Sequence, residues 1–278
     1  MKIEIFDVEH GACALITADN YSRIMIDCGH NATTGWRPGS YLRSIGVTYL
    51  ENLVITNYDE DHVSGICDLF DRVTVGWITR NTSVTPDHIR WLKTQDGMGP
   101  GIDRLIYELT QNFLPAGSPR ATAPHQFSGV AEKYFHHTPQ EFQDENNLSL
   151  LAKFTCNGTN IMFTGDMERA GWLKMIPTPG FIGALQNIDV FIAPHHGRLS
   201  GWCEDLFWYF TPTFTVVSDK SMEHTTQETR DLYAAKTRGG IFNGEAGRKF
   251  VTTRSDGDLI ITPGTGDYLF GKLAQPFG

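Results

Sequence analysis

The chain of 278 residues is 40% hydrophobic and 20% charged, values typical of a globular protein that can bury a sizeable core. Its net charge of −9 argues against a protein that grips long duplex DNA through a basic face. The longest apolar runs are strand-sized and the N-terminus lacks a signal-peptide pattern, so we expect a cytoplasmic protein without a membrane partner. The five scattered cysteines contain no CxxC pair, which predicts neither disulfides nor a structural zinc site.

The N-terminal third alternates apolar and polar residues as half-buried strands do. Strands are predicted at Lys2–Val8, Ala14–Thr17, Arg23–Asp27 and Asn52–Thr56. Short helices at Ser40–Ile45 and Gly65–Phe70 flank the last of these strands. From about residue 85 to 126 the pattern changes to two helices, Pro86–Thr94 and Ile102–Phe113, with Gly/Pro-rich loops, which we interpret as a helical insertion over the sheet.

Strand patterns return after the insertion, and one further helix precedes the C-terminal strands. The predicted elements are strands at Leu148–Phe154, Ile161–Thr164, Val190–Ala193 and Phe214–Ser218, a helix at Thr226–Lys236, and a terminal ribbon of Lys249–Thr253 and Asp258–Thr262. This order predicts an α/β fold in which two packed sheets carry helices on the outside. No linker or internal repeat divides the chain, so we expect one domain over residues 1–278.

The strongest chemical signal directly follows the predicted strand Asn52–Thr56. The segment Asn57-Tyr-Asp-Glu-Asp-His62 places Asp59, Asp61 and His62 at the carboxyl end of that strand. Three such side chains can converge on a cation only from a loop, because a strand sends alternate residues to opposite faces. The alternative is an ordinary helix N-terminus, with one acid as the cap and the others favoured by the helix dipole.

Two further strand ends carry the same kind of chemistry. Thr164-Gly-Asp166 places a carboxylate after one strand, and Pro194-His-His-Gly197 places two imidazoles after another. Neutral imidazole and carboxylate are ligands that Zn, Mn and Fe favour. Each segment alone has an ordinary interpretation, a turn or polar surface, but three together indicate a metal site. Its candidate ligands at this point are Asp59, Asp61, His62, Asp166, His195 and His196.

These motifs resemble the metallo-β-lactamase superfamily, and in finer detail the soluble nuclease-like domain of ComEC-type DNA-uptake proteins. The similar segments are Phe6-Asp-Val-Glu-His-Gly-Ala12, Ile24-Met-Ile-Asp-Cys-Gly29, Asn57–His62, Asn146-Asn-Leu-Ser-Leu150, Pro194–Gly197 and Thr253-Arg-Ser-Asp-Gly-Asp258. The resemblance runs from Ile3 to about Thr262 apart from the insertion, and it implies a four-layer αββα sandwich. The chain departs from the branch at Asn57, where a histidine stands in the related motif.

The resemblance implies two neighbouring ligand pockets. One would use Asp61, His62 and a histidine of the 195–196 pair, with Asp166 shared between the pockets. The other would be left with Asn57, Asp59 and, roughly, Asn147, which offer only oxygen ligands. Oxygen-rich sites favour hard cations, so we expect one or two divalent ions, Mn²⁺ or Zn²⁺, with Mg²⁺ as a further option. A pair of hard ions ranks ahead of a single ion, and a single ion ahead of an inactive centre.

The catalytic roles follow from the charge of the bound metal, which would activate a water and polarise the scissile group. Asp61 or Asp59 would orient or deprotonate the water. The resemblance assigns His224 to stabilising developing charge or protonating the leaving group, although an exposed loop histidine is an equal alternative. Asp27 is expected to fix the metal loop through hydrogen bonds. His10 is expected to be a surface histidine, with a supporting contact to the ligands as the alternative.

The leading functional hypothesis is a phosphodiesterase or nuclease that acts on nucleic acid or nucleotides. The acidic balance favours a short or single-stranded substrate, or a partner protein of a multi-component system that supplies additional grip. One alternative keeps the hydrolase but gives it a lactone, thioester or phosphocholine-type ester as substrate. Another is a catalytically degenerate binding subunit, which Asn57 and Asn147 would favour.

Overall fold

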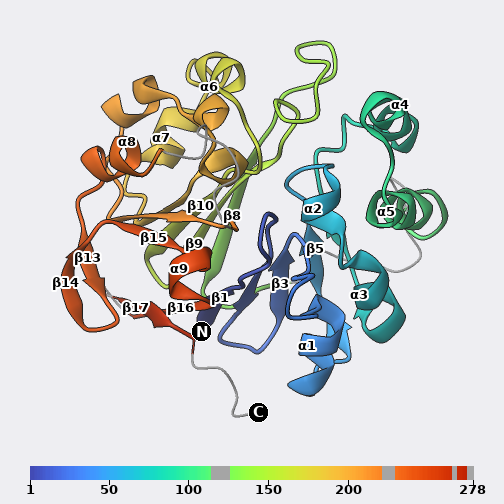
Figure 1. Ribbon diagram of the computed structural model, residues 1–278, viewed down its shortest axis with the longest axis horizontal. Helices are drawn as coiled ribbons and strands as arrows, with labels where there is room; N and C mark the ends of the chain where they lie inside the picture. Colours follow the sequence, from blue (N-terminus) through green and yellow to red (C-terminus); the bar gives the residue numbers. More distant parts are fainter. Residues whose placement is uncertain (114–125, 221–228, 265–267, 274–278) are drawn as a thin grey trace.

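The strands of the structure, a computed structural model, form two main sheets (Figure 1). The structure describes residues 1–113, 126–220, 229–264 and 268–273. The first sheet has the order β17-β16-β1-β2-β3-β5-β7, and the second has the order β15-β12-β11-β10-β9-β8. Their bounds are β1 Lys2–Ile5, β2 Ala14–Thr17, β3 Arg23–Ile26, β5 Asn52–Val54, β7 Ile78–Thr79, β8 Val130–Phe135, β9 Leu151–Cys156, β10 Thr159–Phe163, β11 Val190–Ile192, β12 Phe214–Val217, β15 Phe250–Thr252, β16 Leu259–Pro263 and β17 Tyr268–Lys272.

Shorter elements complete the chain on the outside of the two sheets. Two small ribbons pair β4 (Tyr49–Leu50) with β6 (Thr74–Val75) and β13 (Gly240–Phe242) with β14 (Glu245–Arg248). The helices are α1 Pro38–Ser44, α2 Glu60–Val63, α3 Ile66–Arg72, α4 Pro86–Asp96, α5 Pro100–Gln111, α6 Arg169–Met175, α7 Phe181–Leu185, α8 Arg230–Ala235 and α9 Thr253–Asp256, and the 3₁₀ turns are Pro194–Gly197, Leu199–Gly201 and Glu204–Trp208. Among the helices of the described residues, none is both long and apolar enough to cross a membrane.

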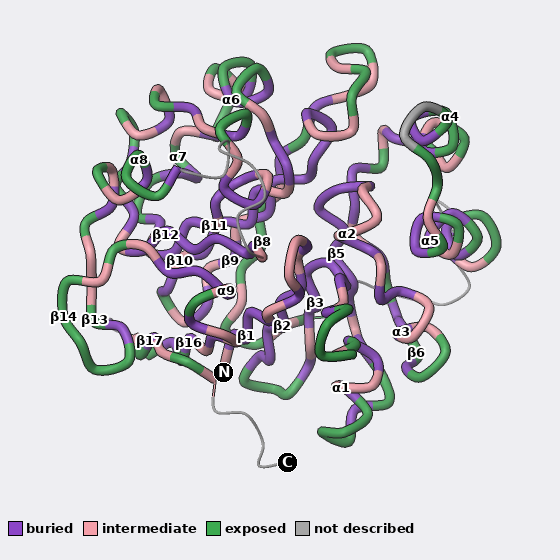
Figure 2. The backbone as a smooth tube through the Cα atoms, viewed as in Figure 1, coloured by how far each residue is buried: buried purple, intermediate pink, exposed green. Residues whose placement is uncertain are grey.

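Alternation along the strands builds the layers. Ile24 and Ile26 of β3 face the other sheet and pack with Phe154 and Val190, whereas Met25 between them faces the helices that cover the first sheet. A third apolar cluster fixes α6, α7 and α8 to the outer face of the second sheet, for example through Trp172. Figure 2 shows the buried backbone concentrated in the sheets and the exposed backbone in the outer turns. The predicted four-layer αββα arrangement is confirmed.

Strand direction decides where a site can form. In the second sheet β10, β11, β12 and β15 are mutually parallel, and in the first sheet β3, β5 and β7 are parallel. Their carboxyl ends therefore lie at a common edge within each sheet, where the loops carrying the predicted ligands begin. In an α/β sheet this is the edge at which ligands usually bind.

The predicted elements and the structure differ in several places. The prediction that the last two strands pair with each other in a terminal ribbon is wrong. Instead β15 pairs with β12 in the second sheet and β16 pairs with β1 in the first, so α9 crosses from one sheet to the other. Several elements had no counterpart among the predicted ones: β8, α6, α7 and the strands β4, β6, β7, β13, β14 and β17. The two helices of the insertion are present as α4 and α5, whereas residues 114–125 lie outside the described part. Of the helix predicted at Thr226–Lys236, only residues 229 onward are described.

Candidate metal centre

The short helix α2, close after β5 in the chain, brings His62 into a buried position between two carboxylates. Asp61 and His62 therefore reach the site from a helical turn, with Asp59 at its N-cap position, and not from a loop as the sequence predicts.

Asp27 directly follows β3, and its carboxylate accepts hydrogen bonds from the Thr56 backbone N–H at 2.7 Å and from the Thr56 hydroxyl. The same carboxylate accepts from His62 Nδ1 at 2.9 Å. This contact turns the ring so that Nε2 points toward Asp166, whose Oδ1 lies 3.0 Å away and accepts a hydrogen bond from the protonated imidazole. Asp27 thus holds the loop as expected and also sets the orientation of the His62 ring.

His196 presents its ring in the same way from the second sheet. Its Nδ1 donates to the carbonyl oxygen of Ser218 at 3.0 Å, which leaves Nε2 with a free lone pair. That nitrogen lies 3.3 Å from Asp61 Oδ2 and 3.6 Å from Asp166 Oδ1. It is buried and, by geometry, has no hydrogen-bond partner among the described residues. A buried lone pair that faces carboxylates without a hydrogen bond is what a metal ligand looks like before a cation lies between them.

We call Asp61, His62, Asp166 and His196 the imidazole cluster. Ligand atoms bound 2.0–2.2 Å from a tetrahedral ion lie about 3.3–3.6 Å apart, which matches the two distances from His196 Nε2. Asp61, His62 and His196 offer ligand atoms that all lie within 4.8 Å of one another. Two imidazole nitrogens and two carboxylate oxygens are a set suited to Zn²⁺, Mn²⁺ or Fe²⁺. The residues present therefore fit a single divalent ion.

Backbone geometry at two loops makes this convergence possible. Gly165 has a φ of +52°, and a Cβ there would lie 2.8 Å from Ser149 Oγ, so only glycine fits before Asp166. Ser149 Oγ in turn accepts from the Asp166 backbone N–H at 3.0 Å. His195 and His196 both have a φ of +51°, a conformation that non-glycine residues rarely adopt.

The left-handed turn separates the two histidines. His195 points away from the imidazole cluster, toward Ser200 Oγ at 2.9 Å and Glu168 Oε1 at 3.4 Å, and its backbone N–H donates to the Gly165 carbonyl. His196 is therefore the member of the pair that the structure brings to the cluster. The ring of His10 lies 5.8 Å from that of His196, so this residue borders the centre and is not a remote surface histidine. His224 lies outside the described residues.

The charges of the imidazole cluster are strongly coupled. Burial opposes protonation of His62, yet the carboxylates of Asp166 and Asp27 raise its pKa well above the usual range. Burial also opposes protonation of His196, but Asp166 and Asp61 raise its pKa. Burial opposes the charged form of Asp61 and of Asp166, but the facing imidazoles lower the pKa of both carboxyl groups. Without a metal, the protons on His62 and His196 supply the positive charge that offsets the carboxylates. A bound divalent ion would supply that charge in their place.

The remaining predicted ligands lie beside this cluster and are engaged with protein atoms. The Asn57 amide donates to Ser149 Oγ at 3.0 Å, and its Oδ1 accepts from the Asp59 backbone N–H at 2.7 Å. Asn147 is turned toward the second sheet's helices, where its Oδ1 accepts from the Gly171 backbone N–H at 2.9 Å. The structure therefore does not bring Asn147 to the cluster as a donor of a free oxygen.

Sequence reasoning missed the residue that contacts Asp59. Lys93 of α4 places its ammonium against the Asp59 carboxylate and 3.1 Å from Glu145 Oε1, and its side chain is only 2% exposed. Burial alone would lower the pKa of Lys93, but Asp59 and Glu145 raise it, so the group is positively charged. Burial raises the pKa of Asp59 to about 6 despite Lys93, with Asp166 adding to the rise. We call Asn57, Asp59, Lys93 and Glu145 the lysine cluster.

The insertion is joined to the metal loop at a second point. Glu60 lies between Asp59 and Asp61, and its carboxylate accepts from the backbone N–H groups of Gly101 and Ile102 at 2.8 and 3.1 Å. It therefore caps the N-terminus of α5. Three successive residues thus have three different partners: Asp59 contacts α4, Glu60 contacts α5, and Asp61 belongs to the imidazole cluster.

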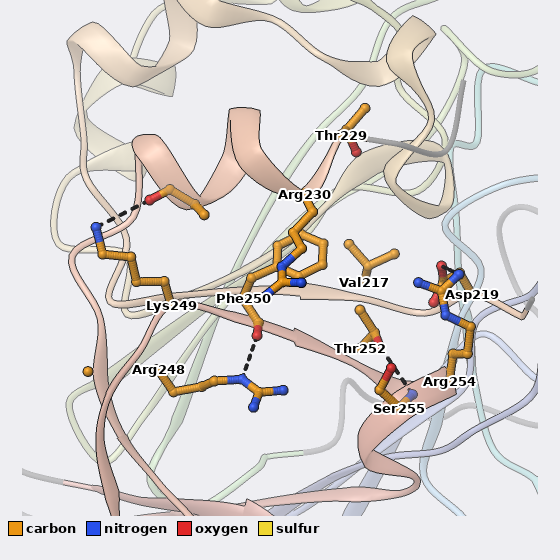
Figure 3. Close-up of a pocket in the computed structure, with 12 residues that line it drawn as sticks. Val217, Asp219, Thr229, Arg230, Arg248, Lys249, Phe250, Thr252, Arg254 and Ser255 are labelled. Carbon is orange, nitrogen blue, oxygen red and sulfur yellow. Dashed lines mark hydrogen bonds and ion pairs between the residues drawn. The ribbon is translucent and has the colours of Figure 1, made fainter. Parts of the chain in front are cut away.

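A basic pocket of about 420 Å³ lies at the second sheet near the same edge (Figure 3). Four basic side chains and one acidic side chain border it: Arg230, Arg248, Lys249, Arg254 and Asp219. Arg248 is held by Asp256 at 2.6 Å and Arg254 by Asp219 at 3.1 Å, whereas Arg230 on α8 is exposed and has no ion pair with a described residue. Asp219 directly follows Ser218, the hydrogen-bond acceptor of His196, so the pocket and the imidazole cluster adjoin through one loop.

No protein-family model and no curated protein sequence matches the chain, but solved structures do. Igni18, a metallo hydrolase from Ignicoccus hospitalis, is 14% identical over 95% of this chain and 100% of its own, with a TM-score of 0.50. CmlA, a diiron β-hydroxylase from Streptomyces venezuelae, is 10% identical over 91% of this chain and 53% of its own, with a TM-score of 0.51. The metallo-β-lactamase fold protein YhfI from Bacillus subtilis is 8% identical over 92% and 98%, with a TM-score of 0.48. The likeness is one of fold, and the chain has the metallo-β-lactamase-like αββα fold.

Proposed function

We propose that this chain is a metal-dependent phosphodiesterase that hydrolyses nucleic acid or nucleotides. The observation that carries the proposal is that the imidazole cluster adjoins a basic pocket in an otherwise acidic protein. A cluster suited to a divalent ion supports hydrolysis in general. The neighbouring positive charge supports an anionic substrate over a neutral lactone or thioester.

A bound ion and the residues of the chain would contribute different parts of the hydrolysis. A divalent ion, Mn²⁺ or Zn²⁺, supplies Lewis acidity toward a phosphoryl oxygen and makes water a better nucleophile near neutral pH. Within the imidazole cluster, the Asp61 side chain is 35% exposed, whereas those of His62 and Asp166 are almost completely buried. Asp61 is therefore the carboxylate placed to receive a proton from water that enters from solvent. Asp27 and the Ser218 carbonyl keep the two imidazoles in fixed orientations.

The size and charge of the basic pocket support a short or single-stranded substrate. With a net charge of −9, the chain repels a long polyanion over most of its surface. Arg230 is exposed and has no ion pair with a described residue, so it can contact phosphate oxygens. Arg254 is held by Asp219, which follows Ser218, the acceptor of His196. The resemblance to the nuclease-like domain of DNA-uptake proteins supports the same substrate class. For longer nucleic acid, we propose that a partner protein contributes further basic contacts.

The test is a substrate panel on purified, metal-stripped protein to which Mn²⁺, Zn²⁺ or Mg²⁺ is added. The panel contains bis-p-nitrophenyl phosphate, labelled single-stranded oligonucleotides, and lactone, thioester and phosphocholine esters. We expect metal-dependent phosphodiester cleavage. Cleavage of the esters with no phosphodiester cleavage would overturn the proposal.

A charge reversal in the pocket makes the same test specific. Arg230→Glu should raise the KM for an oligonucleotide about tenfold, because it places a negative charge beside the phosphates, and should leave the KM for a neutral ester unchanged. Arg43→Glu makes the same change in charge on an exposed residue of α1 and is the matched control. Equal KM values for the two variants would show that the pocket takes no part in substrate binding.

A further inference from the structure

We propose that the ammonium of Lys93 takes the place of a second cation, so that the centre binds one divalent ion, in the imidazole cluster only. The inference rests on the proposed function in that it concerns the same site. It goes beyond that proposal by fixing the number of ions and by assigning a structural charge to the helical insertion.

The first step concerns the position of Lys93. Its side chain is buried between two carboxylates, Asp59 and Glu145, with Nζ in contact with both. The ammonium therefore occupies the space beside Asp59 that a second ion bound by this carboxylate would need.

The second step concerns the ligand atoms that remain. Asn57 Oδ1 accepts from the Asp59 backbone and Asn147 Oδ1 accepts from the Gly171 backbone, so neither amide oxygen is directed at a common point. The amide nitrogen of Asn57 is directed at Ser149, and a protonated nitrogen cannot bind a cation. An ion beside Asp59 would have to displace the ammonium and break these hydrogen bonds.

The third step concerns charge. Asp61 and Asp166 together balance one divalent ion, while the ammonium of Lys93 offsets one of the two negative charges of Asp59 and Glu145. A second divalent ion would sit against a fixed positive charge in a buried setting, where such repulsion is poorly screened. Removing only that charge should therefore open the position, because the two carboxylates would remain.

The experiment measures ion stoichiometry on the full-length chain by equilibrium dialysis against Mn²⁺ and elemental analysis, with electron paramagnetic resonance to detect coupled pairs. The wild type should bind one ion with an uncoupled Mn²⁺ spectrum. Lys93→Ala should bind a second ion and show a coupled spectrum. Lys93→Arg should stay at one ion because it keeps the charge. Lys153→Ala removes a half-buried lysine of β9 and is the matched control, also expected to bind one ion.

Two bound ions in the wild type, no bound ion, or one ion in a folded Lys93→Ala variant would each overturn the inference. If Lys93→Ala does not fold, Lys93→Met keeps the length of the aliphatic chain and replaces it in the same measurement. Phosphodiester hydrolysis is followed on the same samples. One ion without hydrolysis refutes the proposed function and leaves this inference standing, whereas two ions with hydrolysis do the reverse.

Discussion

The imidazole cluster and the lysine cluster lie side by side but are completed in different ways. In the imidazole cluster, His62 and His196 both donate from Nδ1 to protein acceptors. The Nε2 of His62 contacts Asp166, and the Nε2 of His196 faces Asp61 and Asp166 with no hydrogen bond to a described residue. In the lysine cluster, the carboxylate of Asp59 and the amide of Asn57 are bound by other protein groups. Both segments have residue types that bind metals. Residue types alone therefore do not distinguish a metal site from a structural ion pair. A ligand atom that no protein group binds, such as His196 Nε2, does.

The largest expected effect comes from removing Asp166, whose Oδ1 faces both imidazoles of the imidazole cluster. Asp166→Ala should abolish tight binding of the ion and lower kcat by at least about 10³-fold, because a carboxylate that anchors the reacting centre is lost. Metal content and initial rates measure this. Asp189→Ala, which removes a half-buried acid that caps the Asn160 backbone, should keep both close to wild type. A tightly bound ion in Asp166→Ala would contradict the assignment of Asp166 as a ligand, since Asp61, His62 and His196 would then suffice.

The pH dependence of metal stabilisation sharpens the comparison further. In metal-free protein the facing carboxylates raise the pKa values of His62 and His196 above the unfolded value near 6.5. Those protons add stability below about pH 6.5, and that stability is lost as the pH rises through the folded pKa values. Metal binding needs neutral imidazole, so apparent affinity should rise up to about tenfold per pH unit for each proton displaced.

The measurement is the difference in Tm with and without saturating Mn²⁺ across that pH range. The difference should grow from about pH 6.5 to pH 8. Asp166→Ala should show little metal-induced shift at either pH. A difference that shrinks with rising pH would contradict the assignment of the two imidazoles as ligands.

The smallest expected effect concerns the contact between Glu60 and the N-terminus of α5, beside the lysine cluster. Glu60→Ala removes the cap of α5 and should lower the free energy of unfolding by about 1–2 kcal/mol, as helix-cap losses do. Because the imidazole cluster does not use Glu60, Mn²⁺ affinity should change by less than about threefold. Chemical denaturation and metal titration give both values. Asp87→Ala on α4, with a side chain 93% exposed, should change stability by less than about 0.5 kcal/mol.

Most of the long strands, as segments along the chain, and the chemistry at their ends could be predicted because both are local in sequence. Alternation assigned Ile24 and Ile26 to one face of a strand, and the segment around Asp61 follows its strand directly. Pairing of the last strands could not be predicted, since alternation does not say which neighbour a strand joins, and β15 and β16 entered different sheets.

The choice between His195 and His196 and the role of Lys93 needed the folded chain. The choice depends on a left-handed backbone at both histidines, for which neither residue type is a signal. Lys93 lies more than thirty residues beyond its partner Asp59, and single lysines are usually solvated. A buried lysine facing acids can be identified only when the helix that carries it has been placed.

The attachment of the insertion through both Asp59 and Glu60 has a consequence for engineering. Trimming α4 and α5 to obtain a minimal core would not simply shorten the chain. The same cut would leave the Asp59 carboxylate with no counter-charge from α4 and the Glu60 carboxylate with no helix to cap. The insertion is thus part of the charge balance at the edge that carries the imidazole cluster. Replacing it is a route to changing which ions that edge binds.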